Sequence, residues 1–167
     1  MITAGDLIAK YKLLPHPEGG YFTETYRSAE LLSGEYLPDR FGGDRSVSTA
    51  IYFLLERGNF SAFHKIKSDE CWHFYAGQSL LIHIIDTYGR LTTVKLGNDI
   101  FNEEVFQYVV PAGYWFASEP AETTAFSFVG CTVAPGFSFE DFELAKAENL
   151  CSAYPQHKAF IKRLCRD

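Results

Sequence analysis

Hydrophobic and polar residues alternate in short runs along most of the chain, and this period of two residues predicts β-strands rather than helices. Residues 21–27 are the clearest case, with Phe22, Glu24 and Tyr26 on one face and Arg27 on the opposite face. Further runs rich in β-branched and aromatic residues occupy 47–55, 72–75, 80–86, 91–95, 105–110 and 125–133. Turn sequences containing glycine, asparagine or proline separate these runs, so we interpret the centre of the chain as consecutive short strands.

Helical patterns are confined to the two ends of the chain. Residues 3–12 place Leu7, Ile8 and Tyr11 at helical spacing, and Thr3 with Asp6 forms a candidate capping box. Residues 143–150 and 155–164 are rich in helix formers, whereas the glycine, proline and aspartate residues of 31–45 predict a long surface loop. Strands without intervening helices predict an all-β sandwich or barrel, in a single domain of residues 1–167.

Composition and charge narrow the class of partner. With 47% hydrophobic and 22% charged residues, the chain is excluded from the largely disordered class. The net charge of -6 and the scattered positions of the 15 lysines and arginines exclude a nucleic-acid polymer as the partner. Aromatic residues make up 16% of the chain, so we expect some of them to line a pocket or a subunit contact. A small-molecule ligand is therefore expected, and a sugar or a nucleotide suits an aromatic wall.

Neither the cysteines nor the N-terminal segment indicates secretion. The four cysteines form no CxxC pair, so we expect reduced thiols. The first ten residues include Asp6 and Lys10, and no stretch approaches the roughly 18 apolar residues of a membrane span. These features predict a cytoplasmic protein that makes no membrane contact.

The most informative segment runs from Gly58 to Gly77 and has the pattern G-x5-H-x-I-x3-E-x6-G. It resembles the first motif of the cupin superfamily, G-x5-H-x-H-x3-E-x6-G. His64 and Glu70 match that motif, and Ile66 stands in the position of its second histidine. A weaker match to the second cupin motif, P-x-G-x2-H, lies at residues 111–116, with Phe116 in the histidine position.

Further segments resemble the DUF985 family of cupins across residues 11–150. They lie at 16–20, 24–27, 68–73 and 133–141. The resemblance implies a double-stranded β-helix (cupin jelly roll) with short N- and C-terminal helices, and a fold related to deoxysugar epimerases, but it brings no established reaction. It also implies a homodimer, which strands that are apolar on both faces, such as 50–55, independently favour.

Two histidine positions of the cupin motifs are occupied here by Ile66 and Phe116, and this weakens the expectation of a metal site. A mononuclear cupin site uses three imidazoles and one carboxylate, and neither Ile66 nor Phe116 carries a lone pair. His64 and Glu70 alone are too few ligands for tight binding, and strand alternation from Glu70 places His73 on the opposite face. We therefore expect a metal-free pocket that needs no cofactor. The alternative is a metal-dependent cupin using His64, Glu70 and His73, which requires a strand bulge that turns His73 inward.

His64 and Glu70 are the candidate catalytic residues, because the motif spacing directs both into the barrel. In the related epimerases, a histidine at the position of His64 removes a proton next to a carbonyl, and a lysine occupies the position of Glu70. The resemblance thus favours an epimerase- or isomerase-like enzyme acting on a sugar or nucleotide sugar. Two alternatives stay open, a non-catalytic small-molecule-binding cupin and a structural pairing of His64 with Glu70 inside the barrel.

Other residues are candidates for ligand binding. Glu24 is a carboxylate on an aromatic strand face and needs a partner, which Arg27 on the opposite face does not supply. The remaining candidates are Tyr26, Trp72, Trp115, Phe116 and Asp141, and the last of these is also a candidate to orient His64. His16 is expected to be an ordinary loop residue, and Cys131 lacks the neighbouring cation that would activate a thiol.

Overall fold

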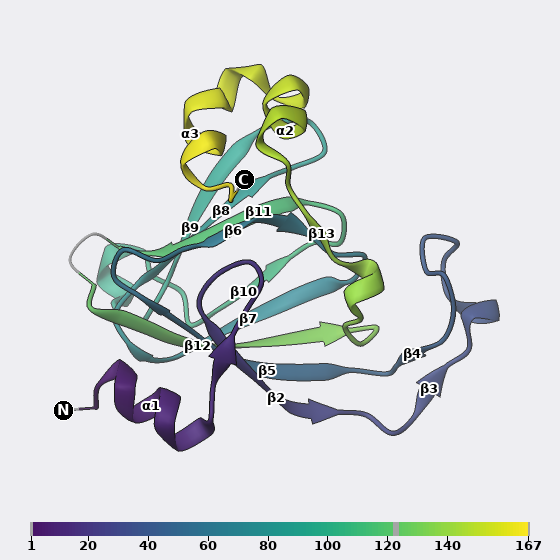
Figure 1. Ribbon diagram of the computed structural model, residues 1–167, viewed down its shortest axis with the longest axis horizontal. Helices are drawn as coiled ribbons and strands as arrows, with labels where there is room; N and C mark the ends of the chain where they lie inside the picture. The colour runs from purple at the N-terminus through teal and green to yellow at the C-terminus, as the bar shows by residue number, and fades with distance from the viewer. Residues whose placement is uncertain (1, 122–123, 167) are drawn as a thin grey trace.

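Two antiparallel β-sheets face each other and form the body of the molecule (Figure 1). The computed structural model describes residues 2–121 and 124–166. In the six-stranded sheet the order is β1 (Leu14–Pro15), β2 (Tyr21–Arg27), β5 (Thr49–Glu56), β12 (Phe126–Ala134), β7 (Asp69–Gly77) and β10 (Gln107–Val110). In the five-stranded sheet it is β13 (Glu143–Leu144), β6 (Ser61–Lys65), β11 (Trp115–Pro120), β8 (Leu80–Ile85) and β9 (Leu91–Leu96).

Smaller elements surround the two sheets. Strands β3 (Leu31–Leu32) and β4 (Arg45–Ser46) pair with each other, and with the 3-10 helix η1 (Gly34–Tyr36) they form an arm that extends from the body in Figure 1. The α-helices are α1 (Ala4–Tyr11), α2 (Ala147–Ala153) and α3 (Lys158–Arg163). The remaining 3-10 helices are η2 (Ile100–Asn102), η3 (Phe139–Asp141) and η4 (Pro155–His157).

Apolar side chains pack in three clusters that explain this layering. The largest lies between the sheets and includes Phe53, Trp72, Ile82 and Phe116. A second cluster joins the outer face of the five-stranded sheet to α2 and α3, and a third joins α1 to the outer face of the six-stranded sheet. The helices therefore cover parts of the outer faces, while the space between the sheets holds the main core and the cavity described below.

The expected all-β fold with short terminal helices is confirmed, including the capping box in which Thr3 and Asp6 satisfy each other's backbone amides. Among the strands longer than two residues, β6 and β11 were not predicted. Their side chains are buried on both faces, because the C-terminal helices cover one side of this sheet, so the alternating pattern is missing. Residues 143–144 are strand rather than helix, and the predicted loop at 31–45 contains β3 and η1. No helix in the described ranges is long and apolar enough to cross a membrane.

Candidate functional site

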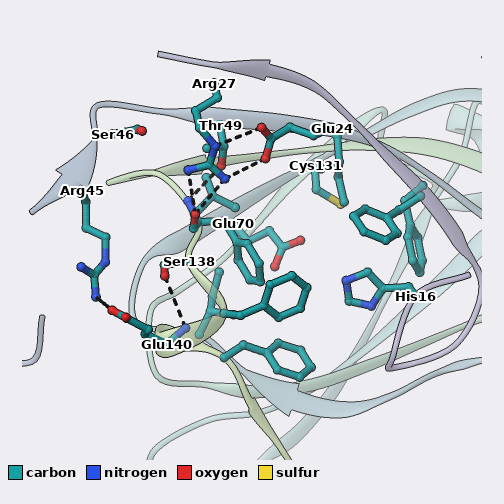
Figure 2. Close-up of a pocket in the computed structure, with 18 of the residues that line it drawn as sticks. His16, Glu24, Arg27, Arg45, Ser46, Thr49, Glu70, Cys131, Ser138 and Glu140 are labelled. Atoms are coloured by element: carbon teal, nitrogen blue, oxygen red, sulfur yellow. Dashed lines mark hydrogen bonds and ion pairs between the residues drawn. The ribbon is translucent and has the colours of Figure 1, made fainter. Parts of the chain in front are cut away.

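A cavity of about 500 Å³ opens between the two sheets, beside the loop that leads into η3 (Figure 2). Its size lies within the range of roughly 300 to 1,000 Å³ that is usual for small-molecule sites. The polar side chains inside it include His16, Glu18, His64, Glu70 and Cys131. Its aromatic wall consists of Phe22, Phe53, Trp72, Phe137, Phe139 and Phe142. The cavity thus combines an apolar wall with a small set of titratable groups, which is the usual composition of a ligand site.

His64 lies on β6, and its ring is almost fully buried against the ring of Phe116, with 4.1 Å between the centroids. Its Nδ1 lies 2.7 Å from the carbonyl oxygen of Ala62. A carbonyl oxygen only accepts hydrogen bonds, so Nδ1 carries the proton. In the neutral imidazole Nε2 is therefore a lone-pair acceptor, and it faces the Oε2 atom of Glu18 at 3.2 Å.

One proton is shared between Glu18 and His64. Both groups are buried, and burial raises the pKa of Glu18 and lowers the pKa of His64. Both shifts disfavour the form of the pair in which His64 is an imidazolium and Glu18 a carboxylate. The hydroxyl of Ser61 donates to the other oxygen of Glu18 at 2.8 Å and fixes the carboxyl in this orientation.

Sequence reasoning missed Glu18 because it lies in a loop outside the recognised motif. The two glycines that follow it have φ values of 113° and 75°, which favour glycine over other residues. A Cβ atom on Gly19 would lie only 2.1 Å from the carbonyl oxygen of Phe60. The loop at 16–20 therefore packs closely enough to bring Glu18 to β6. The Glu-Gly-Gly sequence was the available signal for a carboxylate on a tightly packed turn.

Glu70 projects from β7 into the same cavity and differs from Glu18 in its partners. Figure 2 shows its carboxyl group, Cys131 and His16 pointing toward a common space. Burial raises the pKa of Glu70 to about 7, and the negative charge of Glu18 adds to this effect, whereas His64 and a hydrogen bond from the Cys131 thiol oppose it. Glu70 therefore exchanges between its acid and carboxylate forms near neutral pH. Burial also raises the pKa of Cys131, which leaves its thiol protonated.

His16 is more than an ordinary loop residue, and that expectation was wrong. It lines the cavity, and its Nδ1 accepts a hydrogen bond from the backbone amide of Glu18 at 3.3 Å. This contact leaves the proton on Nε2, so His16 presents a hydrogen-bond donor. The ring is held edge-on by Phe22 and packs against Phe142. Burial lowers the pKa of His16, which favours this neutral form.

The expectation that Arg27 faces away from Glu24 was also wrong. The register between β2 and β5 shifts between Glu24 and Tyr26, so one extra residue bulges and the alternation reverses. Glu24 and Arg27 consequently both line the cavity, and Arg27 donates two hydrogen bonds to the carboxylate of Glu24 at 3.0 and 2.7 Å. The same bulge turns Tyr26 outward to the solvent.

Among the other predicted ligand-binding residues, Trp72 lines the cavity, but Trp115, Phe116 and Asp141 lie outside its lining. Trp115 faces the cluster beneath the C-terminal helices, on the other side of its sheet, and Phe116 is core. Asp141 does not orient His64, because both of its oxygens accept hydrogen bonds from Arg45, at 2.6 and 2.7 Å.

The residues of the candidate metal site do not fit a metal. His73 faces the outer side of the six-stranded sheet, where its Nε2 bonds the hydroxyl of Thr132 and its Nδ1 bonds the amide of Gln107. The alternative ligand set of His64, Glu70 and His73 is therefore wrong. Among the residues that the structure describes, no three histidine, cysteine, aspartate or glutamate side chains are grouped in a way that could hold a metal ion. The lone pair of His64 that a metal would need is directed at Glu18 instead.

Comparisons with known proteins were made by sequence and by structure. Residues 5–145 match the family described as Cupin superfamily (DUF985). An uncharacterized protein of Saccharomyces cerevisiae is 34% identical over 155 residues, which covers 86% of this chain and 75% of the yeast protein. A sequence match of this extent shows family membership.

Solved structures agree with the sequence match. A Shewanella oneidensis protein is 43% identical with a TM-score of 0.88, over 99% of each chain. A hypothetical protein from Leishmania major is 36% identical with a TM-score of 0.89, over 99% of this chain and 100% of the other. Oxalate decarboxylase from Bacillus subtilis, at 17% identity and a TM-score of 0.53, shares only the fold, over 90% of this chain and 36% of that enzyme.

Proposed function

The chain belongs to the DUF985 family of the cupin superfamily and has the cupin fold, and from this premise we propose that it is a metal-independent enzyme of the isomerase or epimerase type. Its substrate is a small polar molecule of the sugar class, held in the cavity between the sheets. The single observation that carries this proposal is a buried carboxyl, Glu70, that faces the cavity with a pKa of about 7 beside the buried Glu18–His64 pair.

Glu70 is the group best suited to exchange a proton with the ligand. The nitrogen of His64 that carries a lone pair already faces Glu18, which leaves Glu70 as the base directed at the open cavity. We propose that the Glu70 carboxylate removes a proton from a carbon next to a carbonyl group. Return of that proton by Glu70 to a neighbouring carbon completes an isomerisation without any other reactant.

A hydrogen-bond donor in the cavity supports the proposed reaction. Removal of a proton next to a carbonyl places negative charge on the carbonyl oxygen, and a donor aimed at that oxygen stabilises the transition state. The Nε2 proton of His16 is such a donor in the same cavity. Each group regains its original proton when the product forms, so the cycle balances.

The experiment that tests this proposal measures deuterium uptake. The protein is incubated in deuterated water with aldoses, ketoses, amino sugars, sugar phosphates and nucleotide sugars, and NMR detects deuterium at carbons next to a carbonyl. We expect uptake in at least one compound, and a loss of at least about 100-fold in Glu70→Gln. Glu148→Gln, which changes an exposed glutamate on α2, is the matched control and is expected to retain the wild-type rate.

The alternative of a non-catalytic binding protein predicts a different result in the same experiment. Compounds would bind in the cavity and raise the melting temperature, yet none would exchange a proton with solvent. Absence of deuterium uptake in every compound that binds would therefore contradict the enzymatic proposal and favour the binding function. Binding by itself does not distinguish the two functions.

We also propose that the chain forms a homodimer through the outer face of its six-stranded sheet. Cross-strand pairs place Tyr26, Ala50, Thr132, Cys71 and Val109 in one row on that face. This row contains no charged side chain. The residues at its two ends, Tyr26 and Val109, are 54% and 45% exposed. In a two-fold interface the same surface patch of each subunit meets its copy, so an uncharged row avoids like-charge repulsion.

Light scattering with size-exclusion chromatography tests the homodimer. The wild-type protein is expected at twice the chain mass of 18.9 kDa. Ala50→Arg places a charge at the centre of the row and is expected to give monomers with an unchanged circular dichroism spectrum. Thr92→Arg, on the exposed edge strand β9 of the other sheet, is the control and should remain dimeric. A wild-type protein that elutes as a monomer would contradict the proposal.

A further inference from the structure

The positive charges that line the cavity are already bound to carboxylates. In the described part of the chain, the cavity lining contains two cations, Arg27 and Arg45. Arg27 donates two hydrogen bonds to Glu24, and its outer nitrogens also donate to the carbonyl oxygen of Phe137 at 3.2 Å. This guanidinium therefore has few donors left for a ligand.

Arg45 is satisfied even more fully. It makes the same two-bond contact with Asp141, at 2.6 and 2.7 Å, and a third bond to the carbonyl oxygen of Asp44 at 2.8 Å. Both partners of this ion pair are buried, with side-chain exposures of 5% and 3%. Separating a buried pair leaves an unpaired charge, so Arg45 is not free to turn toward a ligand.

The remaining charges of the cavity are negative. Glu18 and Glu70 lie inside it, and Asp44 and Glu140 lie at its edge, where the side chain of Glu140 is 78% exposed. The apolar wall combines aromatic rings, whose faces carry partial negative charge, with the aliphatic side chains of Leu31, Ile51, Ile66 and Val133. Proteins usually bind phosphate and carboxylate groups through paired hydrogen bonds from an arginine. Such a group bound in this cavity would face carboxylates and ring faces and would find no free guanidinium.

We infer that this cavity selects ligands that carry no negative charge, so that the substrate class is the uncharged sugars rather than sugar phosphates or nucleotide sugars. The inference rests on the proposed function, because it concerns the ligand of the same cavity. It also explains the bulge in β2, which brings Arg27 to the side of the sheet on which Glu24 lies and neutralises that carboxylate at the cavity edge.

A matched pair of fluorescent probes tests the charge preference without knowledge of the substrate. N-phenyl-1-naphthylamine and 8-anilino-1-naphthalenesulfonate share one carbon skeleton and differ by a sulfonate group. The chain has two tryptophans, so Trp115→Phe leaves Trp72 in the cavity wall as the sole tryptophan donor for energy transfer to a bound probe. We expect the uncharged probe to bind at least about tenfold more tightly. Equal or tighter binding of the sulfonate, or no binding of either probe, would overturn the inference.

A second variant tests the role of Arg27. In the same background, Glu24→Gln removes the carboxylate charge and leaves the charge of Arg27 uncompensated. The sulfonate probe is then expected to bind about tenfold more tightly, while the affinity for the uncharged probe stays within about twofold. Glu119→Gln releases Arg163 in the same way, but that pair lies outside the cavity lining, and this control should change neither affinity. An unchanged sulfonate affinity in Glu24→Gln would also overturn the inference.

The deuterium experiment separates this inference from the proposed function. Exchange in an uncharged sugar supports both statements. Exchange confined to sugar phosphates or nucleotide sugars overturns the charge preference and leaves the isomerase function intact. Absence of exchange in all compounds contradicts the isomerase function, and the probe titrations then still decide whether the cavity excludes negative charge.

Discussion

Replacing Glu70 by glutamine should stabilise the protein at high pH and have little effect at low pH. The folded protein holds the proton of Glu70 more tightly than the unfolded chain does, because burial raises the pKa from its ordinary value of 4.5 to about 7. The contribution of this carboxyl to the free energy of unfolding is therefore fully present below pH 4.5 and is lost as the pH rises through 7. Glutamine has no such loss, because it does not ionise.

The magnitude follows from the difference between the two pKa values. Each tenfold change in proton affinity corresponds to about 1.4 kcal/mol, so the interval from 4.5 to about 7 corresponds to about 3 kcal/mol. We expect the stability difference between Glu70→Gln and wild type to grow by about this amount between pH 4.5 and 8.

Urea denaturation followed by circular dichroism, repeated at half-unit steps of pH, measures this difference. Glu148→Gln serves as the control for an exposed glutamate, and its difference from wild type should not vary with pH. If the difference for Glu70→Gln is also constant across the range, Glu70 is not a buried carboxyl with a raised pKa and the reasoning is refuted.

Three further predictions address the pH dependence and the supports of the site. The value of kcat/KM for deuterium exchange should rise about tenfold per pH unit below pH 7 and level off above it, because the carboxylate form of Glu70 is the base. A rate that falls as the pH rises toward 7 would argue against this role. Arg45→Met leaves Asp141 buried without its main partner and should lower the free energy of unfolding by about 3 kcal/mol, as measured by urea denaturation. A loss below about 1 kcal/mol would contradict the importance of this buried ion pair. Gly20→Ala should cost about 1 to 3 kcal/mol, because φ is 75° there and a Cβ atom would lie 2.7 Å from the backbone carbonyl oxygen of Leu54. Gly5→Ala within α1 should be neutral or stabilising, because a Cβ atom there would make only an ordinary contact with Thr3 Oγ1 at 3.9 Å.

Local sequence patterns predicted those parts of the structure that depend on local rules. The alternating runs located most strands, and the capping box located the start of α1, because each of these signals depends on neighbours within a few residues. The motif spacing also predicted that His64 and Glu70 line one cavity. They lie on β6 and β7, which follow each other in the chain but belong to the two facing sheets, and both side chains point into the space between these sheets.

The residues that were misplaced depend on tertiary contacts or on exceptions to alternation. A single extra residue in β2 reverses the facing of Arg27 and Tyr26, and a bulge leaves no clear mark in the amino-acid pattern. Glu18 reaches His64 through a loop whose path is set by packing against β6. Asp141 meets Arg45 across 96 positions of sequence, a pairing that no local rule predicts. These contacts position the charged groups of the cavity, so the ligand preference proposed above could not have been derived from the sequence alone.

The most direct test of the account is the titration of Glu70 itself. Carbon-13 labelling of the glutamate carboxyl groups allows NMR to follow each of them from pH 3 to 9, and Glu70→Gln identifies the signal of residue 70. We predict that this signal has its midpoint near pH 7. A midpoint near 4.5 would mean that the carboxyl is solvated like an exposed glutamate, and it would contradict the proposed proton transfer in the cavity.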